Sequence, residues 1–244
     1  MQGSRTNEAT SKSTYVFGAI GSHFTVNPNL LVGAMMQFDL IDQNDGSADV
    51  RGRGWLVGPY IVAKIPEQEV YLEGRFLYGE TSNTISPFGT YTDNFDTKRF
   101  LAQAKVSGIL RYGQTHLTPS LQVSYTSDEQ QTYTDTPGNV IPEQRIELGQ
   151  LELGLKFDTP APFYRGNGVM KVTGGVSVIG SLVSNSGNVA AVVSDFDGGR
   201  ARLELGLNFE AGNGAVLAIN THYDGIGARG LESFGMQVGF NMKF

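Results

Sequence analysis

The last fourteen residues, 231–244, constrain the fold of this chain more than any other segment. Their sequence, LESFGMQVGFNMKF, places apolar side chains on one parity and small or polar side chains on the other, from Phe234 to Phe244. A period of two predicts a strand with one apolar and one polar face. The segment is longer than a typical globular strand and matches what a tilted strand needs to cross a bilayer. We therefore expect its apolar face in lipid and its polar face in the lumen of a barrel.

Ten further segments have strand character, so eleven strands are visible in the sequence. They are residues 13–25, 30–41, 53–65, 69–79, 97–112, 117–127, 145–158, 168–182, 200–211 and 215–224. The alternation is clear where Leu203 and Leu205 oppose Arg202 and Glu204. In 145–158 the apolar parity changes, which predicts a β-bulge near residues 149–150.

The connections between these segments alternate in length. Short turns are expected at 26–29, 66–68, 113–116, 159–167 and 212–214, and long polar loops at 42–52, 80–96, 128–144 and 183–199. Short periplasmic turns opposite longer outer loops are typical of bacterial outer-membrane barrels. The predicted fold class is therefore all-β: a transmembrane antiparallel β-barrel at residues 13–244, integral to the bacterial outer membrane, after a polar segment at 1–12.

Closure of the barrel requires one more strand than the pattern reveals. With eleven strands, segments 13–25 and 231–244 would meet in parallel, whereas bacterial single-chain barrels have even strand numbers and antiparallel pairs. An open seam would leave backbone groups unpaired in lipid. We expect twelve strands, with the first encoded before Met1 or drawn from residues 1–12. Because the start lacks the apolar core of an export signal, we also expect the chain to be mature or a fragment.

Charge and parity predict which side chains line the lumen and which face lipid. A cation on the lipid face at mid-membrane would cost about 2–4 kcal/mol, so charged residues on the strands should point inward. The predicted lumen-lining residues are Glu73, Arg75, Lys105, Arg111, Glu152, Lys156, Arg202 and Glu204. The predicted aromatic girdles at the two membrane interfaces are Phe38, Trp55, Tyr78, Phe100, Tyr125, Tyr223 and Phe234 at the loop end, and Tyr112, Phe157 and Phe209 at the turn end.

The composition argues against catalysis, cofactors and nucleic acid. The chain has no cysteine, a net charge of −6 and no basic run, so neither a thiolate metal site nor nucleic acid as a partner is expected. Acidic residues are frequent in the expected loops, but none has the spacing of a calcium site. His222 precedes Asp224 by two residues, yet no nucleophile motif accompanies it. We predict no catalytic residues, no metal and no cofactor.

Several segments together resemble the autotransporter β-domain, the translocator barrel of type V secretion. TYVFGAIGSHFTVNPNLLVGAMMQF is similar to its early hairpin, and GWLVGPYIVAK with VYLEGRFLYGETSN resembles the next one. The segment from RARLELGLNFE to the terminal aromatic resembles its last three strands. The resemblance implies a translocator that carries an N-terminal passenger, with a lumenal helix or linker, to the cell surface. It also implies that the barrel assembly machinery reads the terminal strand, with Phe244 as the assembly signal.

The resemblance leaves two main functional hypotheses. The first is the translocator domain, whose partners are outer-membrane lipid, its own N-terminal passenger or lumenal segment, and the assembly machinery. The alternative is a stand-alone porin-like or adhesin barrel that acts through its lumen or loops. A third reading, a soluble β protein, would need no detergent. The sequence upstream of Met1 distinguishes the first two, because a long passenger favours the translocator.

Overall fold

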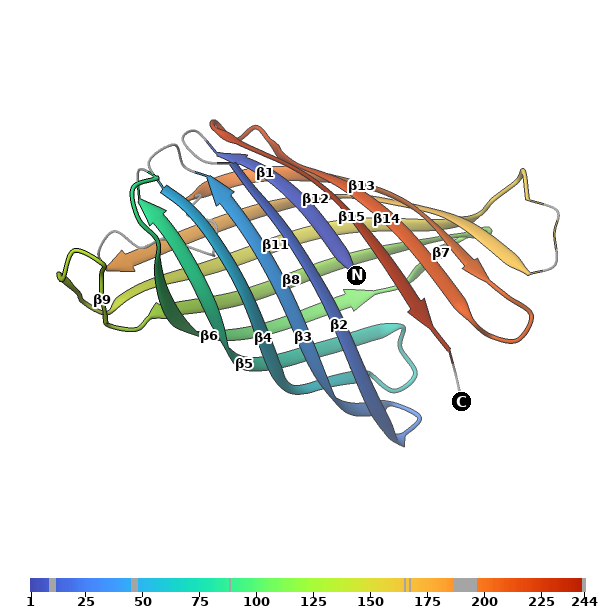
Figure 1. Cartoon of the computed structure of the whole chain (residues 1–244). Helices are drawn as coiled ribbons and strands as arrows, with labels where there is room; N and C mark the ends of the chain where they lie inside the picture. Colours follow the sequence, from blue (N-terminus) through green and yellow to red (C-terminus); the bar gives the residue numbers. More distant parts are fainter. Residues whose placement is uncertain are drawn as a thin grey trace.

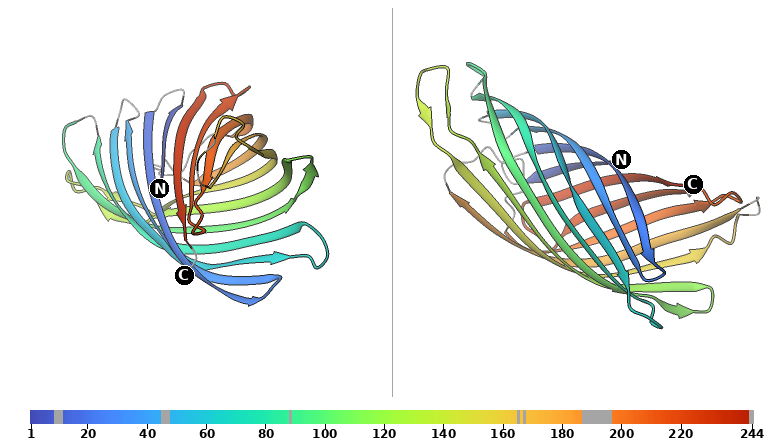
Figure 2. Two further views of the ribbon diagram at one scale, coloured as in Figure 1. Left: turned by 90° about the vertical axis from the view of Figure 1, so that its right-hand side faces the viewer. Right: turned by 90° about the horizontal axis from the view of Figure 1, so that it is seen from below.

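The chain forms a single curved sheet that closes on itself (Figures 1 and 2). The computed structural model describes residues 1–8, 12–44, 48–87, 89–164, 166, 168–186 and 197–242. Within them, the wall strands are β1 (Gln2–Glu8), β2 (Lys12–Asn27), β3 (Leu30–Asn44), β4 (Ala48–Lys64), β5 (Val70–Pro87), β6 (Asp93–Gly108), β8 (Thr115–Gln130), β11 (Gln144–Pro160), β12 (Val169–Ser186), β13 (Gly198–Glu210), β14 (Val216–Ile226) and β15 (Leu231–Asn241). Three short strands accompany them: β7 (Leu110–Tyr112), β9 (Tyr133–Thr134) and β10 (Val140–Ile141).

The described strands therefore make a closed antiparallel barrel of twelve. Strand β7 belongs to the same sheet but pairs only with β8 beside a turn, while β9 and β10 form a hairpin of their own. Every neighbouring pair in the wall is antiparallel, and each wall strand pairs with the next wall strand in the sequence. At the seam, the first strand, β1, pairs with the last, β15. No helix among the described residues is long and apolar enough to cross a membrane.

The seam is closed by the polar N-terminal segment. Strand β1 lies antiparallel between β15 and β2, with Gln2 opposite Gln237 on one side and Phe17 on the other. The prediction of a twelfth strand is confirmed, and it is drawn from residues 1–12 rather than standing apart from the barrel. Sequence patterning missed this strand because QGSRTNE lacks alternating apolar residues.

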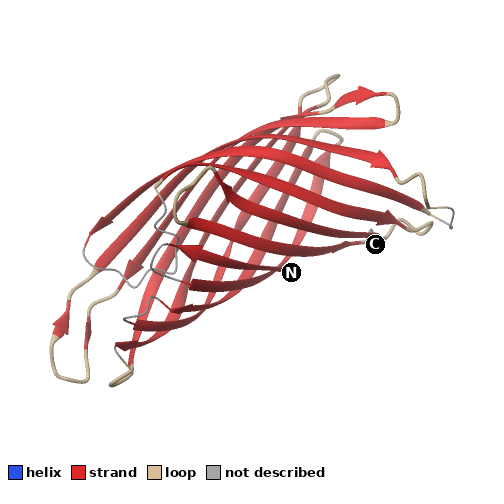
Figure 3. Cartoon of the chain, turned by 90° about the horizontal axis from the view of Figure 1, so that it is seen from above, coloured by secondary structure: helices blue, strands red, loops and turns tan. Residues whose placement is uncertain are grey.

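The seam is complete over only part of its height. After Phe17 in the sequence, the edge of β2 that faces β1 has no strand partner among the described residues. Exposed residues follow one another there without alternation, from Ala19 to Asn27. Figure 3 shows the strands crossing at a steep tilt, and Figure 1 shows the N-terminus partway along the wall beside β15.

The strands are longer than the sequence predicted. Strands β2 to β12 of the wall have 15 to 18 residues each, whereas about 9–11 suffice to cross a bilayer. Segments predicted as loops at 42–52 and 80–96 are mostly strand, so the wall continues beyond the membrane at that end. Below, the end that carries these longer connections is called the loop end, and the opposite end the turn end.

The predicted β-bulge in β11 is wrong. Its register with both neighbours, β8 and β12, is continuous through Gly149 and Gln150. Ile146 and Leu148 instead point into the barrel and are buried there. The parity changed in the sequence because the interior itself becomes apolar toward the loop end.

Candidate functional site

The lumen is the concave feature that a barrel offers for function, and its two halves differ. Toward the loop end, inward-facing side chains fill the interior. Four apolar side chains there are at most 2 % exposed: Leu56, Leu77, Ile146 and Ile179. These four residues come from β4, β5, β11 and β12, so they approach the interior from different sides of the wall. The loop half is therefore packed rather than open.

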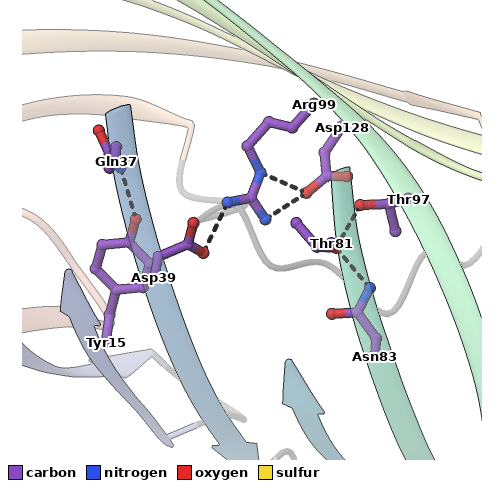
Figure 4. Close-up of polar contacts among 8 residues, drawn as sticks. All are labelled: Tyr15, Gln37, Asp39, Thr81, Asn83, Thr97, Arg99 and Asp128. Carbon is purple, nitrogen blue, oxygen red and sulfur yellow. Dashed lines mark hydrogen bonds and ion pairs between the residues drawn. The ribbon is translucent and has the colours of Figure 1, made fainter. Parts of the chain in front are cut away.

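A buried ionic cluster lies in the loop half (Figure 4). Arg99 of β6 donates from Nη1 to Asp39 of β3 at 2.9 Å, and from Nε and Nη2 to Asp128 of β8 at 3.1 and 2.9 Å. Strands β3 and β6 are not neighbours, so the first contact crosses the interior. The three side chains are 6 %, 1 % and 4 % exposed. We call these three residues the Arg99 cluster.

Polar side chains surround the Arg99 cluster. Gln37 donates to the hydroxyl of Tyr15 at 3.4 Å, and the hydroxyls of Thr81 and Thr97 lie 2.7 Å apart. Asn83 donates to Thr81 at 2.7 Å. These contacts join the neighbouring strands β2 and β3 on one side of the cluster and β5 and β6 on the other. Asp39 Oδ1, Asn83 Oδ1 and Asp128 Oδ1 have no hydrogen-bond partner among the described residues, so the network is only partly satisfied.

A second ionic cluster lies on the opposite side of the wall. Asp224 of β14 accepts from Arg200 Nε at 2.9 Å and from Arg202 Nη2 at 2.6 Å. Arg200 also donates to Ser181 at 2.6 Å, and Ser181 accepts from Gln150 at 3.0 Å. We call these residues the Arg200 cluster. It ties β11 to β14 from the inside.

The turn half is more open and carries charges of both signs. Lys156 and Glu204 are 2.5 Å apart, and Lys105 and Glu73 are 3.4 Å apart, with all four side chains partly exposed. Gln103 donates to Gln122 at 2.6 Å beside them. A cavity of about 1,240 Å³ reaches from lumenal residues of β4 and β5 to the unpaired edge of β2.

Two buried polar atoms of the turn half lack a partner. Arg75 Nε and Asn208 Oδ1 make no hydrogen bond within the described part of the chain. Buried polar atoms are nearly always satisfied in native proteins. The loop half also has such unpaired atoms, among them Asp39 Oδ1, Asn83 Oδ1 and Asp128 Oδ1, so they do not by themselves distinguish the two halves. The cavity, which Arg75 borders, makes the turn half the region best suited to hold another polar segment.

The structure distributes the predicted lumen-lining residues over three places. Glu73, Arg75, Lys105, Lys156 and Glu204 lie in the turn half, as described above, and Glu152 of β11 shares their face by register with Gln122. Arg202 lies in the Arg200 cluster. Arg111 lies on β7 at the turn end, where its guanidinium is 3.8 Å from Glu69 of the neighbouring turn.

The predicted girdle residues also fall in more than one setting. Those exposed on the wall near the loop end are Phe38, Trp55, Tyr78, Tyr125, Tyr223 and Phe234. Phe100 is half-buried between Phe76, at 4.5 Å between ring centroids, and Tyr125, at 6.0 Å. At the turn end, Tyr112 is exposed, Phe157 is half-buried, and Phe209 contacts Tyr164 at 5.8 Å. Phe244, the predicted assembly signal, lies outside the described residues.

The three histidines lie on three different strands, β2, β8 and β14. No group of three or more His, Asp or Glu side chains there could hold a metal ion. The ring of His222 covers Gly235, where an added methyl group would overlap it. His23 pairs with the Tyr60 hydroxyl at 3.1 Å. Both rings have packing or hydrogen-bonding roles in the wall.

The loop-half clusters were missed at the level of sequence. Parity alone places Arg99 on the polar face, but it cannot say that Asp39, three strands away, lies within reach. That contact depends on the curvature of the closed sheet. The signal that could have drawn attention to it was the parity change in β11, which marks the point where the interior becomes apolar.

These features define a class of protein. A closed antiparallel barrel with an apolar outer wall, aromatic residues toward its rims and a polar, charged lumen is an integral β-barrel of the bacterial outer membrane. Residues 2–223 match the family model described as autotransporter beta-domain, and the chain belongs to this family. It is therefore a translocator barrel of type V secretion, a transport domain that carries an N-terminal passenger in the outer membrane.

Solved structures of translocator domains have the same fold. The β-domain of the Bordetella autotransporter BrkA has a TM-score of 0.79 at 16 % identity, covering 100 % of this chain and 96 % of its own. The translocator domain of NalP from Neisseria meningitidis has 0.74 at 20 %, covering 100 % and 86 %. The transport unit of AIDA-I from Escherichia coli has 0.75 at 13 %, covering 100 % and 88 %. A comparison of the sequence with curated proteins gives no match.

Proposed function

We propose that this barrel anchors a passenger attached at its N-terminal side and holds the connecting segment in the turn half of its lumen. The observation that carries the proposal is the unequal lumen. The loop half is filled by side chains, while the turn half has a cavity of about 1,240 Å³. Arg75 borders this cavity, and its buried Nε, which has no partner among the described residues, offers a hydrogen bond to a polypeptide there.

The remaining contacts of the protein follow from the same assignment. The predicted lumen residues of the turn half, Glu73, Arg75, Lys105, Glu152, Lys156 and Glu204, face the threaded segment. The aromatic girdles contact outer-membrane lipid, because aromatic side chains favour the membrane interfaces. The assembly machinery recognises the terminal strand through Phe244. The barrel itself performs no catalysis, and any enzymatic activity of the whole protein belongs to its passenger.

Export of a reporter tests the proposal. A folded reporter preceded by a secretion signal is fused before Met1, and its exposure is measured by protease added to intact cells. The charge-reversing variant Lys105→Glu with Lys156→Glu should slow exposure of the reporter while the barrel level stays unchanged. The matched control, Lys98→Glu with Arg229→Glu, reverses two exposed cations outside the lumen and should leave export unchanged. A wild-type barrel that never exposes the reporter contradicts the proposal.

A porin-like function makes a different prediction for the same protein. A stand-alone channel should give large, steady ionic currents in a planar bilayer. The packed loop half favours a low conductance, because its side chains leave little space for hydrated ions. Conductance of the purified chain therefore separates the two functions, and a large constant current would favour the porin.

A further inference from the structure

The outward face of β4 carries a column of side chains that the lumen does not use. Val50 and Leu56 point into the barrel and are almost completely buried. The residues of the other parity, Arg51, Arg53 and Trp55, are exposed on the outside. From the loop end inward, the outer face of this strand thus changes from cationic to aromatic. Apolar residues follow, beginning with Val57, which is also exposed.

The two arginines border a depression on the outer wall. It has a volume of about 780 Å³ and extends over β2 to β6. Its rim combines the small hydroxyl side chains of Thr14, Ser82 and Thr84 with the apolar side chains of Val16 and Leu40. Hydroxyls can bond to phosphate oxygens and to sugar hydroxyls, whereas the apolar side chains suit an acyl chain.

The arginines differ in their existing partners. Arg51 Nε lies 3.3 Å from Asp42, and both side chains remain mostly exposed. Arg53 has no carboxylate within 4.0 Å in the described part of the chain. A guanidinium without an anionic partner, next to polar side chains, is ready to bind a phosphate in a bidentate manner. Asp42 and Asp96 also border the depression. Its two carboxylates offset the two guanidinium groups, so the depression does not attract polyanions in general.

The expected positions of the two arginines along the membrane normal agree with the position of the lipid phosphate groups. Along a strand tilted by about 40°, two residues rise by roughly 5 Å and four residues by roughly 10 Å along the membrane normal. If Trp55 marks the edge of the hydrocarbon, Arg53 lies within a headgroup layer about 5–7 Å deep, and Arg51 lies just beyond it.

We propose that Arg51 and Arg53 form a binding site for a phosphorylated glycolipid of the outer leaflet. Arg53 binds the phosphate, Arg51 supports it from the outer side, and the hydroxyls of Thr14 and Ser82 contact the sugar. An acyl chain lies along Leu40 and the Phe38–Trp55 pair, which face each other across β3 and β4. The site is independent of the lumen and of any passenger.

Fluorescence of Trp55 provides a direct test, because it is the only tryptophan of the chain. The purified barrel in detergent is titrated with bis-phosphorylated lipid A, with dephosphorylated lipid A and with inorganic phosphate. The variant Arg51→Gln with Arg53→Gln is compared with the control Lys98→Gln with Arg229→Gln, which removes equal charge elsewhere. An arginine near an anionic lipid surface contributes about fivefold in affinity, so the first variant should bind lipid A about twenty-five-fold more weakly.

Each result decides for or against the site. A selective loss of affinity in the arginine variant, with the control within about twofold of the wild type, supports it. Equal losses in both variants would show a general effect of charge and overturn it. Equal binding of dephosphorylated lipid A would overturn the role of the phosphate. Competition by inorganic phosphate at the concentration of lipid A would indicate a site for a free anion instead. Retention of heat-dependent migration in a gel shows that the variants are folded.

Discussion

The two halves of the lumen both contain charged side chains, but they differ in how far these side chains are exposed to water. In the loop half, Arg99 lies between two carboxylates and all three groups are withdrawn from solvent. In the turn half, Lys105 and Glu73 form a single pair that keeps contact with water. Burial makes the first arrangement rigid and sensitive to any change. Hydration makes the second tolerant, which is what a conduit for varied polypeptide requires.

The strongest way to break this comparison is to remove Arg99. Arg99→Ala leaves Asp39 and Asp128 buried without their cation, which should destabilise the barrel by about 3–5 kcal/mol. Lys105→Ala removes an equivalent charge from the open half and should cost about 0–1 kcal/mol. Equilibrium unfolding in urea, with the barrel refolded into lipid vesicles, measures both. Equal losses would mean that the two halves do not differ in hydration.

A truncation in the apolar part of the loop half should be nearly as damaging. Leu77 is 0 % exposed, so Leu77→Ala should leave a cavity and cost about 2–5 kcal/mol. Leu205→Ala, on the outer wall where the side chain is 64 % exposed, provides the control. It should cost clearly less, because no packed interior is lost there. The same unfolding measurement applies, and a harmless Leu77→Ala would contradict a packed interior.

Chemical labelling compares access to the two halves directly. The chain has no cysteine, so single cysteines can be introduced without background. A cysteine at Gln122, in the open half, should react with a water-soluble maleimide at least about tenfold faster than one at Thr81, which is 2 % exposed. Similar rates at the two positions would show that water fills the loop half as well.

The smallest effect is expected outside the lumen, in the turn after β4. Glu69 accepts from Lys64 Nζ at 3.2 Å and from Tyr71 at 3.0 Å, and the hydrogen bond from Lys64 lowers the pKa of Glu69. A lowered pKa means that this contribution to stability is present at neutral pH and is lost as pH falls through the folded-state pKa. Glu69→Gln should abolish that acid-dependent part, slightly changing the melting temperature at neutral pH. Identical pH profiles for variant and wild type would contradict it.

The sequence predicted the architecture because the bilayer imposes a simple rule. Only alternate residues meet lipid, so parity in segments such as 200–211 revealed the strands and the two faces. Parity did not predict the structure where contact with lipid no longer determines which residues are apolar. The apolar residues Ile146 and Leu148 face inward near the loop end, and β1 carries no large apolar side chain. The Arg99 cluster could not be predicted from the sequence for another reason: its members come into contact only when the sheet has closed.

The short seam strand also has a mechanical consequence. β1 is held on both sides by a ladder that begins at Gln2 near mid-wall and ends at the loop end. Tension on Met1 directed toward the turn end would load all of these hydrogen bonds together, in shear. Tension directed toward the loop end would instead peel the strand away one residue at a time, starting from Gln2. We therefore expect β1 to resist a force toward the periplasmic turn end much better than a force toward the outer loop end.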